Sequence, residues 1–185
     1  VLFSSLSFGA TINVPGDQLT IQAGIDAASD GDTVLIQPGT YVENINFNGK
    51  NIIVGSLFLS TEDNTYISRT KIDGDYWDAT VRIENGESAS AQLVGMSITN
   101  GVRGIIIAGA SPAIKNCWVH NNTVAGDSAG GGINVYNSAA NIINSKIFSN
   151  HARSGGGLSL SAYNGELRGC YIYSNTNFDG PGNQV

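Results

Sequence analysis

The sequence predicts an all-β protein, a parallel β-helix solenoid of about six coils with a short helix over its N-terminal end. Three observations predict this fold class. Charged residues make up 13% of the chain, against about 25% in an average soluble protein. Gly (24) and Asn (20) are abundant among the 185 residues, which is typical of a chain with many turns. Short alternating apolar stretches recur at a nearly constant spacing.

The recurring stretch is a short strand followed by a turn. Copies occupy residues 95–101, 116–122, 144–150 and 169–175, at spacings of 21, 28 and 25 residues. A second set of alternating stretches accompanies them at residues 104–107, 132–135 and 157–160. Strands that recur once every 20 to 30 residues or so stack in parallel, about 4.8 Å apart, and so build a solenoid.

The copies also predict the register of the coils. Two columns are expected to face inward: Met96, Cys117, Ser145 and Cys170 in one, and Ile98, Val119, Ile147 and Ile172 in the other. A third column, at the turn, consists of Gly101, Asn122, Asn150 and Asn175. There we expect positive backbone φ angles and Asn side chains that hydrogen-bond along the axis. The two cysteines lie two coils, or roughly 9.6 Å, apart, so we expect two buried, free thiols rather than a disulfide.

Before the repeats, residues 17–28 favour a short helix that ends at Asp30-Gly31, and residues 33–41 favour a strand and a turn. We therefore expect residues 15–32 to cap the first coil, residues 33–176 to form the β-helix and residues 177–185 to form a C-terminal tail.

Residues 1–14 are apolar and uncharged. Two interpretations stay open: the remnant of a secretory signal peptide, or a strand that lies along its own barrel or adds to the sheet of a neighbouring copy. The residues of this candidate assembly strand are Val1, Leu2, Phe3, Leu6, Phe8, Ile12 and Val14.

The stretch from Thr20 to Ile45 (TIQAGIDAASDGDTVLIQPGTYVENI) resembles the N-terminal cap and first coil of the right-handed parallel β-helix, or pectin-lyase-like, superfamily. Residues 70–74 (TKIDG) and 93–101 (LVGMSITNG) are similar to later coils of secreted bacterial members, and residues 130–133 with the Asn-containing repeats resemble polymorphic outer-membrane adhesins. The resemblance covers residues 20–176. It implies a right-handed coil outside a bacterial cell, but no activity, because this superfamily hosts lyases, hydrolases, binding modules and structural proteins.

The outward positions of the three best-defined coils favour a non-catalytic protein. A polysaccharide lyase needs carboxylates that hold Ca²⁺ and a basic residue, and a glycoside hydrolase needs paired carboxylates. The outward positions carry Trp118, His120, Lys146, Phe148, Tyr171 and Tyr173, none of which is acidic. Neither the paired-aspartate and Gly-His-Gly patterns of polygalacturonase-like enzymes nor a pectate-lyase-like cluster of Asp with Arg is recognised in the sequence. If the protein is an enzyme after all, those two activities are the candidates.

The same outward positions form a candidate interaction face. One column holds Trp118, Lys146 and Tyr171, and the adjacent column holds His120, Phe148 and Tyr173. Several rings on one face usually mark an interaction site. Three interpretations stay open: a protein interface, a platform on which sugars stack, or a face covered by another part of the chain, such as residues 177–185.

A candidate metal site lies at Asp73, Asp75 and Asp78, since Ca²⁺ prefers carboxylate oxygens. The alternative is a polar turn, because Asp and Gly also favour turn geometry. No other cofactor is expected.

The formal net charge of −6 argues against a nucleic-acid partner, and no run of 18 apolar residues predicts a membrane-spanning helix. We therefore expect a secreted or cell-surface structural or adhesive protein. It would associate with itself, even into filaments, through its N-terminal strand, its open C-terminal coil or its aromatic face. The alternative is a polysaccharide-binding or polysaccharide-cleaving domain.

Overall fold

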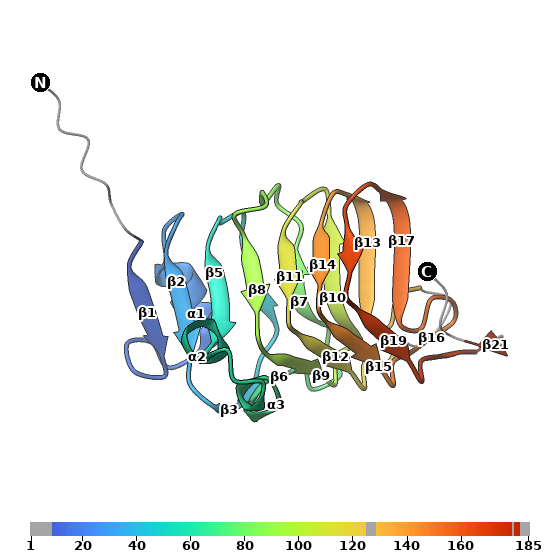
Figure 1. Cartoon of the computed structure of the whole chain (residues 1–185), viewed down its shortest axis with the longest axis horizontal. Coiled ribbons are helices and arrows are strands. Elements are labelled where there is room, and N and C mark those ends of the chain that lie inside the picture. Colours follow the sequence, from blue (N-terminus) through green and yellow to red (C-terminus); the bar gives the residue numbers. More distant parts are fainter. Residues whose placement is uncertain (1–8, 125–128, 179, 182–185) are drawn as a thin grey trace, which may run out of the picture.

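The computed structural model describes residues 9–124, 129–178, 180 and 181, which form a parallel β-solenoid with three long sheets (Figure 1). The coils follow one another from β1 (Thr11–Val14) at one end to β17 (Leu158–Tyr163) and β19 (Tyr171–Tyr173) at the other. A complete coil contributes one strand to each sheet in turn, so neighbours within a sheet are far apart in the sequence. The predicted fold class is confirmed.

The three sheets can be described by their strands in spatial order. The seven-stranded sheet consists of β1, β2 (Thr33–Ile36), β5 (Ile53–Ser56), β8 (Gln92–Val94), β11 (Ala113–Lys115), β14 (Asn141–Ile143) and β18 (Leu167–Arg168). The six-stranded sheet consists of β3 (Gly39–Val42), β6 (Thr70–Asp73), β9 (Ser97–Thr99), β12 (Trp118–His120), β15 (Lys146–Phe148) and β19. The five-stranded sheet consists of β4 (Ile45–Asn46), β7 (Ala79–Ile83), β10 (Arg103–Ala108), β13 (Ile133–Ser138) and β17.

A fourth, small sheet lies at a corner of the last coils. It consists of β16 (His151–Ala152), β20 (Thr176–Asn177) and β21 (Gly180–Pro181), and its β20–β21 pair is antiparallel whereas all the other pairs of strands are parallel.

The solenoid has about seven turns, one more than the repeats predicted. The additional strand is β1, which pairs in parallel with β2 over Thr11↔Thr33 to Val14↔Ile36. The side chain of Val14 is completely buried, and Ile12 packs against the same core. Ile12 and Val14 therefore lie along their own barrel, which was one of the alternatives for this segment. Val1, Leu2, Phe3, Leu6 and Phe8 lie outside the described residues.

The predicted N-terminal helix is α1 (Ile21–Ala27), and it packs against β1, β2 and β4 at the first coil. Both of its ends are held by the coil below. Glu43 accepts hydrogen bonds from the backbone N–H groups of Ile21 and Gln22, each at 2.9 Å. The Lys50 ammonium donates to three carbonyls at the other end of the helix, at 2.7–2.8 Å. A carboxylate at the N-terminus and a cation at the C-terminus also match the helix dipole.

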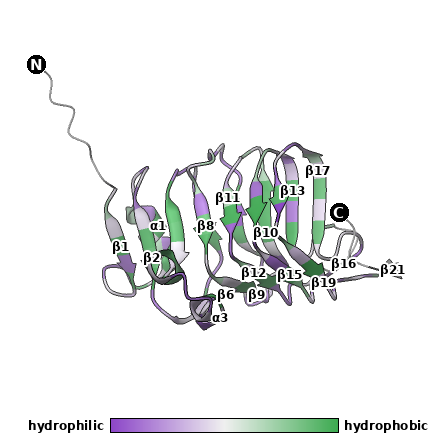
Figure 2. Cartoon of the chain, in the orientation of Figure 1, coloured by the Kyte–Doolittle hydropathy of each residue, from purple (hydrophilic) through white to green (hydrophobic). Residues whose placement is uncertain are grey.

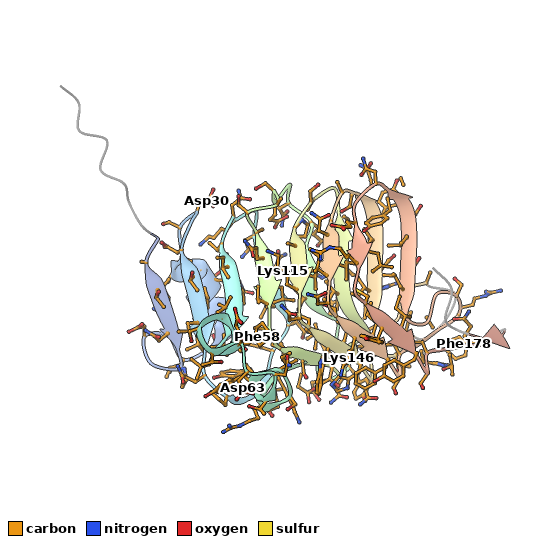
Figure 3. The ribbon with its side chains drawn as sticks, in the orientation of Figure 1. Asp30, Phe58, Asp63, Lys115, Lys146 and Phe178 are labelled. Atoms are coloured by element: carbon orange, nitrogen blue, oxygen red, sulfur yellow. The ribbon has the colours of Figure 1, made fainter. Side chains whose placement is uncertain are left out.

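Two short helices, α2 (Phe58–Thr61) and α3 (Thr65–Arg69), were not predicted from the sequence. They interrupt the third coil and pack on the outer side of its strands; Phe58 and Asp63 mark their place in Figure 3. The Ser97 hydroxyl donates to the Ile67 carbonyl at 3.0 Å, which buries this outward serine beneath α3. The outer face of the six-stranded sheet is therefore covered at β9 and free from β12 onward.

The interior consists of the predicted apolar columns, whose apolar residues recur along the stacked strands (Figure 2). Ile98, Val119, Ile147 and Ile172 occupy one register across four coils, as expected. The first three of these side chains are fully buried. Burying one such aliphatic side chain contributes about 1.5–3 kcal/mol, so the columns supply much of the free energy of folding.

The Asn column differs from the prediction in one respect. Positive φ occurs one residue earlier than expected, for example at Asn121 (56°) and Ser149 (54°). Asn122, Asn150 and Asn175 instead point inward and are buried. Each one accepts through Oδ1 from the backbone N–H of the preceding coil, and the Nδ2 groups of Asn122 and Asn150 donate to the next Asn at 2.9 and 3.0 Å. The predicted axial hydrogen bonds between Asn side chains are confirmed, and the left-handed turn residue is their neighbour.

Two glycines beside the five-stranded sheet lie close to this Asn ladder. Gly132 and Gly157 directly precede β13 and β17. A methyl group at Gly132 would lie 2.4 Å from the Gly157 carbonyl oxygen and 2.8 Å from Nδ2 of Asn150, and one at Gly157 would lie 2.5 Å from Nδ2 of Asn175. Real carbon atoms do not approach so closely, so a side chain at either position would displace the ladder or the neighbouring coil.

We predict that Asn150→Ala destabilises the protein by more than about 2 kcal/mol. The substitution leaves buried backbone and amide groups of Asn122, Val119 and Asn175 without their partner, and each unsatisfied group costs about 1–3 kcal/mol. Urea denaturation followed by circular dichroism measures the change. Asn164→Ala, at an exposed Asn, is the control and should change the free energy of unfolding by less than about 0.5 kcal/mol. Equal losses in the two variants would contradict the role of the ladder.

Candidate functional site

The predicted aromatic face lies on the outer side of the six-stranded sheet, over β12, β15 and β19. Trp118, Lys146 and Tyr171 share one register column, and His120, Phe148 and Tyr173 share the next. Lys146 is labelled on this side of the molecule in Figure 3. The sequence thus predicted the two columns correctly.

The rings of this face stack on one another along the solenoid axis. The centroids of His120 and Phe148 lie 4.8 Å apart with an interplanar angle of 13°, and those of Phe148 and Tyr173 lie 5.2 Å apart at 5°. In the other column the Lys146 ammonium lies 4.8 Å from the Trp118 ring centroid, a cation–π contact. The facing sides of His120, Phe148 and Tyr173 are therefore occupied by one another, whereas Tyr171 in the other column is 67% exposed.

His120 lies at the buried end of its column. Burial of its imidazole, with a smaller contribution from the charge of Lys71, lowers the pKa of His120 below its ordinary value. Its Nδ1 atom is buried and has no hydrogen-bond partner among the described residues. The neutral ring is thus favoured, which suits its stacking on Phe148.

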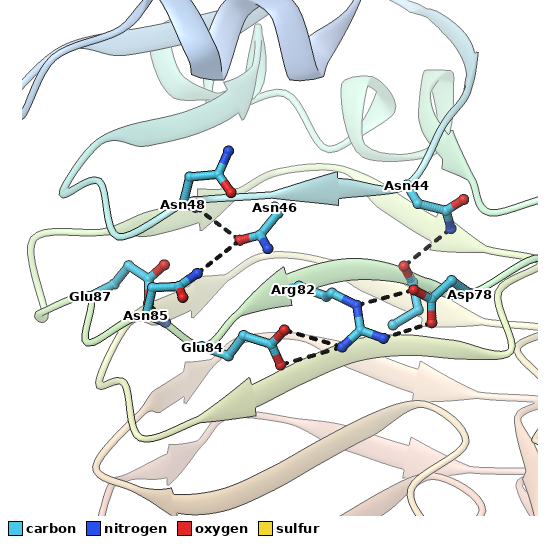
Figure 4. A network of polar contacts seen from close by, with 9 residues as sticks. Asn44, Asn46, Asn48, Asp78, Arg82, Glu84, Asn85 and Glu87 are labelled. Carbon is cyan, nitrogen blue, oxygen red and sulfur yellow. Dashed lines mark hydrogen bonds and ion pairs between the residues drawn. The ribbon is translucent and has the colours of Figure 1, made fainter.

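A second cluster, on the outer side of the five-stranded sheet, was missed by the sequence analysis (Figure 4). Its centre is Arg82 in β7, which bonds Asp78 at 2.7 and 3.2 Å and Glu84 at 3.2 and 3.3 Å. Planar amides surround the ion pairs, and Asn46 accepts from Asn48 and Asn85. The outward positions considered in the sequence belong to the six-stranded sheet alone. The signal that was overlooked is the alternation Arg82-Ile83-Glu84, which puts both charges on the outer face.

The chemistry of this cluster is that of one guanidinium paired with two carboxylates. The hydrogen bonds from Arg82 lower the pKa of Asp78, and Asp78 in turn raises the pKa of Arg82. A general acid requires a raised carboxyl pKa and a general base requires a free lone pair. Asp78 meets neither requirement, so the cluster favours binding or structure over acid–base catalysis.

The candidate calcium ligands do not converge. Asp73 accepts from the backbone N–H of Asp75 and from Nδ2 of Asn100, whereas Asp78 is paired with Arg82. In the part of the chain that the structure describes, no group of three or more His, Cys, Asp and Glu side chains is placed to hold a metal ion. The geometry of residues 73–78 is therefore that of the alternative interpretation, a polar turn.

This turn presents Trp77 to solvent. Its indole is 85% exposed. The two residues before it, Asp75 and Tyr76, both have positive φ angles, at 48° and 53°. Bonds from Tyr76 to Asn100, through both the backbone and the phenol, hold this conformation. Such left-handed residues cost about 1–3 kcal/mol each, and they concentrate at functional positions.

The two cysteines are free, as predicted. Cys117 is fully buried, and this burial raises the pKa of its thiol to about 12. The expectation that both thiols are buried is wrong for Cys170, which is only half buried because it belongs to the last described coil.

The apolar side chains of the last described coil are less buried than those of the coil before it. β17, β18 and β19 are the outermost strands of their sheets among the described residues. Leu160, Leu167 and Ile172 are only partly buried, although their register partners one coil earlier, Val135, Ile142 and Ile147, are fully buried. Among the described residues, no further coil covers these apolar side chains and strand edges.

Comparison with known protein families agrees with this architecture. Residues 55–183 match the family described as a right-handed β-helix region. The chain belongs to this β-helix family. No curated protein shows significant similarity to the sequence. Among the described residues of this β-helix protein, none of the helices has the length and apolar character of a membrane span.

We predict that His120 makes the β-helix less stable as the pH falls from about 7.5 to 5. The pKa of His120 is lower in the folded chain than the value of about 6.5 expected when unfolded, so below about pH 6.5 the unfolded chain binds a proton that the folded chain resists. Urea denaturation at several pH values measures the decline. His120→Phe, which keeps a ring in the stack, should flatten it. His151→Gln leaves His120 in place and should preserve it; the reverse pattern would contradict the assignment.

Proposed function

We propose that the protein is a non-catalytic extracellular β-helix module, structural or adhesive, that associates with another copy of itself through its last coil. One observation carries this proposal: Leu160, Leu167 and Ile172 of the last described coil are partly exposed, although their register partners one coil earlier are fully buried, and they lie beside the outer edges of three sheets.

A free strand edge is a template for pairing with another strand, and a solenoid terminus usually needs a cover. Removing Leu160, Leu167 and Ile172 from water adds a favourable term of about 25 cal/mol for each Å² of apolar surface buried. A second copy supplies apolar side chains and strand edges of the same kind. The last coil is therefore better suited to association than the other two candidates.

Those other candidates are less favourable. The rings of the aromatic face are stacked within their own columns, which supports an intramolecular role for most of that face. Ile12 and Val14, from the candidate assembly strand, are already built into the first coil.

A non-catalytic role is supported by the chemistry of the two outer faces. The six-stranded sheet presents rings and Lys146, and the carboxylates of the five-stranded sheet are paired with Arg82. The extracellular assignment is supported by the low content of charged residues and by the apolar segment of residues 1–14.

A second candidate function is the binding of an extracellular polysaccharide. It is favoured by the exposed indole of Trp77, which is next to Asp78 in the sequence. Asp78 pairs with Arg82, and both belong to the amide-rich cluster of Figure 4. A flat ring with a free face, next to amides and charges, is the combination that stacks on sugar rings and bonds their hydroxyl groups.

The association is tested by light scattering after size exclusion, over protein concentrations from about 1 to 500 μM, where complexes of micromolar affinity form. We expect a concentration-dependent increase in mass that Ile172→Lys weakens at least tenfold. A lysine there can reach solvent from the open end of a free chain, but an interface would bury it.

The matched control is Ile147→Lys, one coil earlier in the same column. It places a charge in the closed core and should unfold the protein, as seen by circular dichroism. A wild-type mass that stays monomeric at every concentration would overturn the proposal.

The second candidate is tested by affinity electrophoresis through gels that contain acidic or neutral polysaccharides. We expect retardation of the wild type and its loss in Trp77→Ala, with Tyr136→Ala as the control, because Tyr136 is also exposed on the five-stranded sheet. Equal retardation of both variants and the wild type would exclude Trp77 as the contact. Release of unsaturated uronic products would instead indicate cleavage.

A further inference from the structure

The chain contains four Asn-Gly pairs, at residues 48–49, 85–86, 100–101 and 164–165. In such a pair the backbone nitrogen of the Gly can attack the side-chain amide carbon of the Asn and close a succinimide ring. Gly favours this attack because it has no Cβ in the way and its backbone turns easily. The attack also needs a Gly N–H that is not held in a hydrogen bond and a peptide that is free to rotate. The four pairs can therefore be compared by what holds each Gly.

Two of the four Gly N–H groups are held by hydrogen bonds. The N–H of Gly49 donates to Oε1 of the buried Glu87 at 2.9 Å. The N–H of Gly101 donates to Oδ1 of Asn122, in the buried Asn ladder, at 2.9 Å. Each nitrogen would first have to give up this bond and leave a buried acceptor without its partner. The fold thus protects the pairs at residues 48–49 and 100–101.

The pair at residues 164–165 is held by packing. No described residue accepts a hydrogen bond from the N–H of Gly165, but a methyl group on this Gly would overlap the Ala140 carbonyl oxygen of the preceding coil. The N–H of Asn164 donates to the Ser138 carbonyl at 3.0 Å. Ring closure requires the peptide between the two residues to rotate, and contacts on both sides of this peptide oppose the rotation.

The pair at residues 85–86 is held in neither way. It lies in the turn after β7, and both of its residues are exposed. Among the described residues the N–H of Gly86 has no acceptor, and a methyl group on this Gly would have no atom within 4 Å. The side chain of Asn85 makes one long hydrogen bond, from Nδ2 to Oδ1 of Asn46 at 3.4 Å (Figure 4). A bond of that length is weak, so the amide carbon of Asn85 is open to attack.

We propose that Asn85 is a site of spontaneous deamidation, and that the folded chain leaves this one of its four Asn-Gly pairs reactive. The Gly86 nitrogen forms a bond to Cγ of Asn85 and loses its proton, and the side-chain amide nitrogen takes up a proton and leaves as ammonia with the electron pair of its broken bond. Water then adds to one carbonyl carbon of the succinimide and breaks the bond from that carbon to the ring nitrogen. The product is an aspartate or an isoaspartate at residue 85, with one water consumed and one ammonia released.

This change would alter the polar cluster of Figure 4. A carboxylate cannot donate to Asn46, so the bond between the two side chains is lost and two acceptor oxygens face each other. The new negative charge lies next to Glu84 in the sequence, where Arg82 already pairs with two carboxylates. The outer face of the five-stranded sheet thus becomes more acidic as the protein ages. The inference is independent of the proposed self-association.

The test follows the folded, full chain at mildly alkaline pH, which favours loss of the proton from the attacking nitrogen. Water enriched in heavy oxygen labels each product, and peptide mapping by mass spectrometry measures the label at every Asn-Gly pair. We expect residue 85 to convert at least about tenfold faster than the other three, because each of those must first break a hydrogen bond or a packing contact. The matched control is the same chain unfolded in urea, where all four pairs should react at similar rates.

A variant separates this site from the rest of the chain. Asn85→Gln keeps an exposed amide, but its longer side chain closes a ring much more slowly. On anion exchange the wild type should accumulate a more acidic species with time and Asn85→Gln should not, whereas the control Asn164→Gln should behave like the wild type. Circular dichroism checks that both variants are folded.

Two results would overturn the inference. One is a second Asn-Gly pair that converts as fast as residue 85 in the folded chain. The other is an Asn85 that stays intact in the folded chain but reacts in urea. Neither result depends on the mass of the protein in solution, which tests the proposed self-association separately.

Discussion

The parallel register between successive coils is the constraint on which the rest of the structure depends. It is fixed inside the solenoid by the Asn ladder, in which Asn122, Asn150 and Asn175 satisfy backbone groups of neighbouring coils that the turn leaves unpaired. Slipping one coil by a single residue would bury amides without hydrogen-bond partners. It would also move Gly132 or Gly157 away and put a residue with a side chain at a position where only Gly fits. The apolar columns contribute more free energy, but any well-filled column would supply it; the ladder selects one register.

That same register produces the features on the outer surface. The residue next to each inward side chain on a strand points outward, so aligned inward columns also align the outward ones. His120, Phe148 and Tyr173 therefore stack once the Asn ladder fixes the register. The stacked rings become part of the scaffold and lose most of their free faces. The most exposed aromatic side chains among the described residues are Trp77 on its turn, at 85%, and Tyr171, at 67%. Among the described residues, α1 covers the first coil and no helix covers the last one.

The sequence predicted the fold, the inward and outward columns and the N-terminal helix, since each follows from local alternation and repeat spacing. It failed where contacts join distant segments. The place of the strand β1 stays open in the sequence because one short stretch carries no repeat, and α2 and α3 cannot be recognised because four- and five-residue helices have almost no period. The positive φ angle was placed one residue late, on Asn122 instead of Asn121, since Asn tolerates both roles.

The sequence by itself thus determined that this chain is a parallel β-helix and which side chains share a column, because the period of two along a strand and the spacing of the coils are written in the residue order. Only the tertiary structure decided which surfaces are available. It paired Asp78 and Glu84 with Arg82, stacked the rings face to face and left Ile172 partly exposed. These outcomes depend on distances between residues many positions apart and on what covers them, and the order of residues along the chain contains neither.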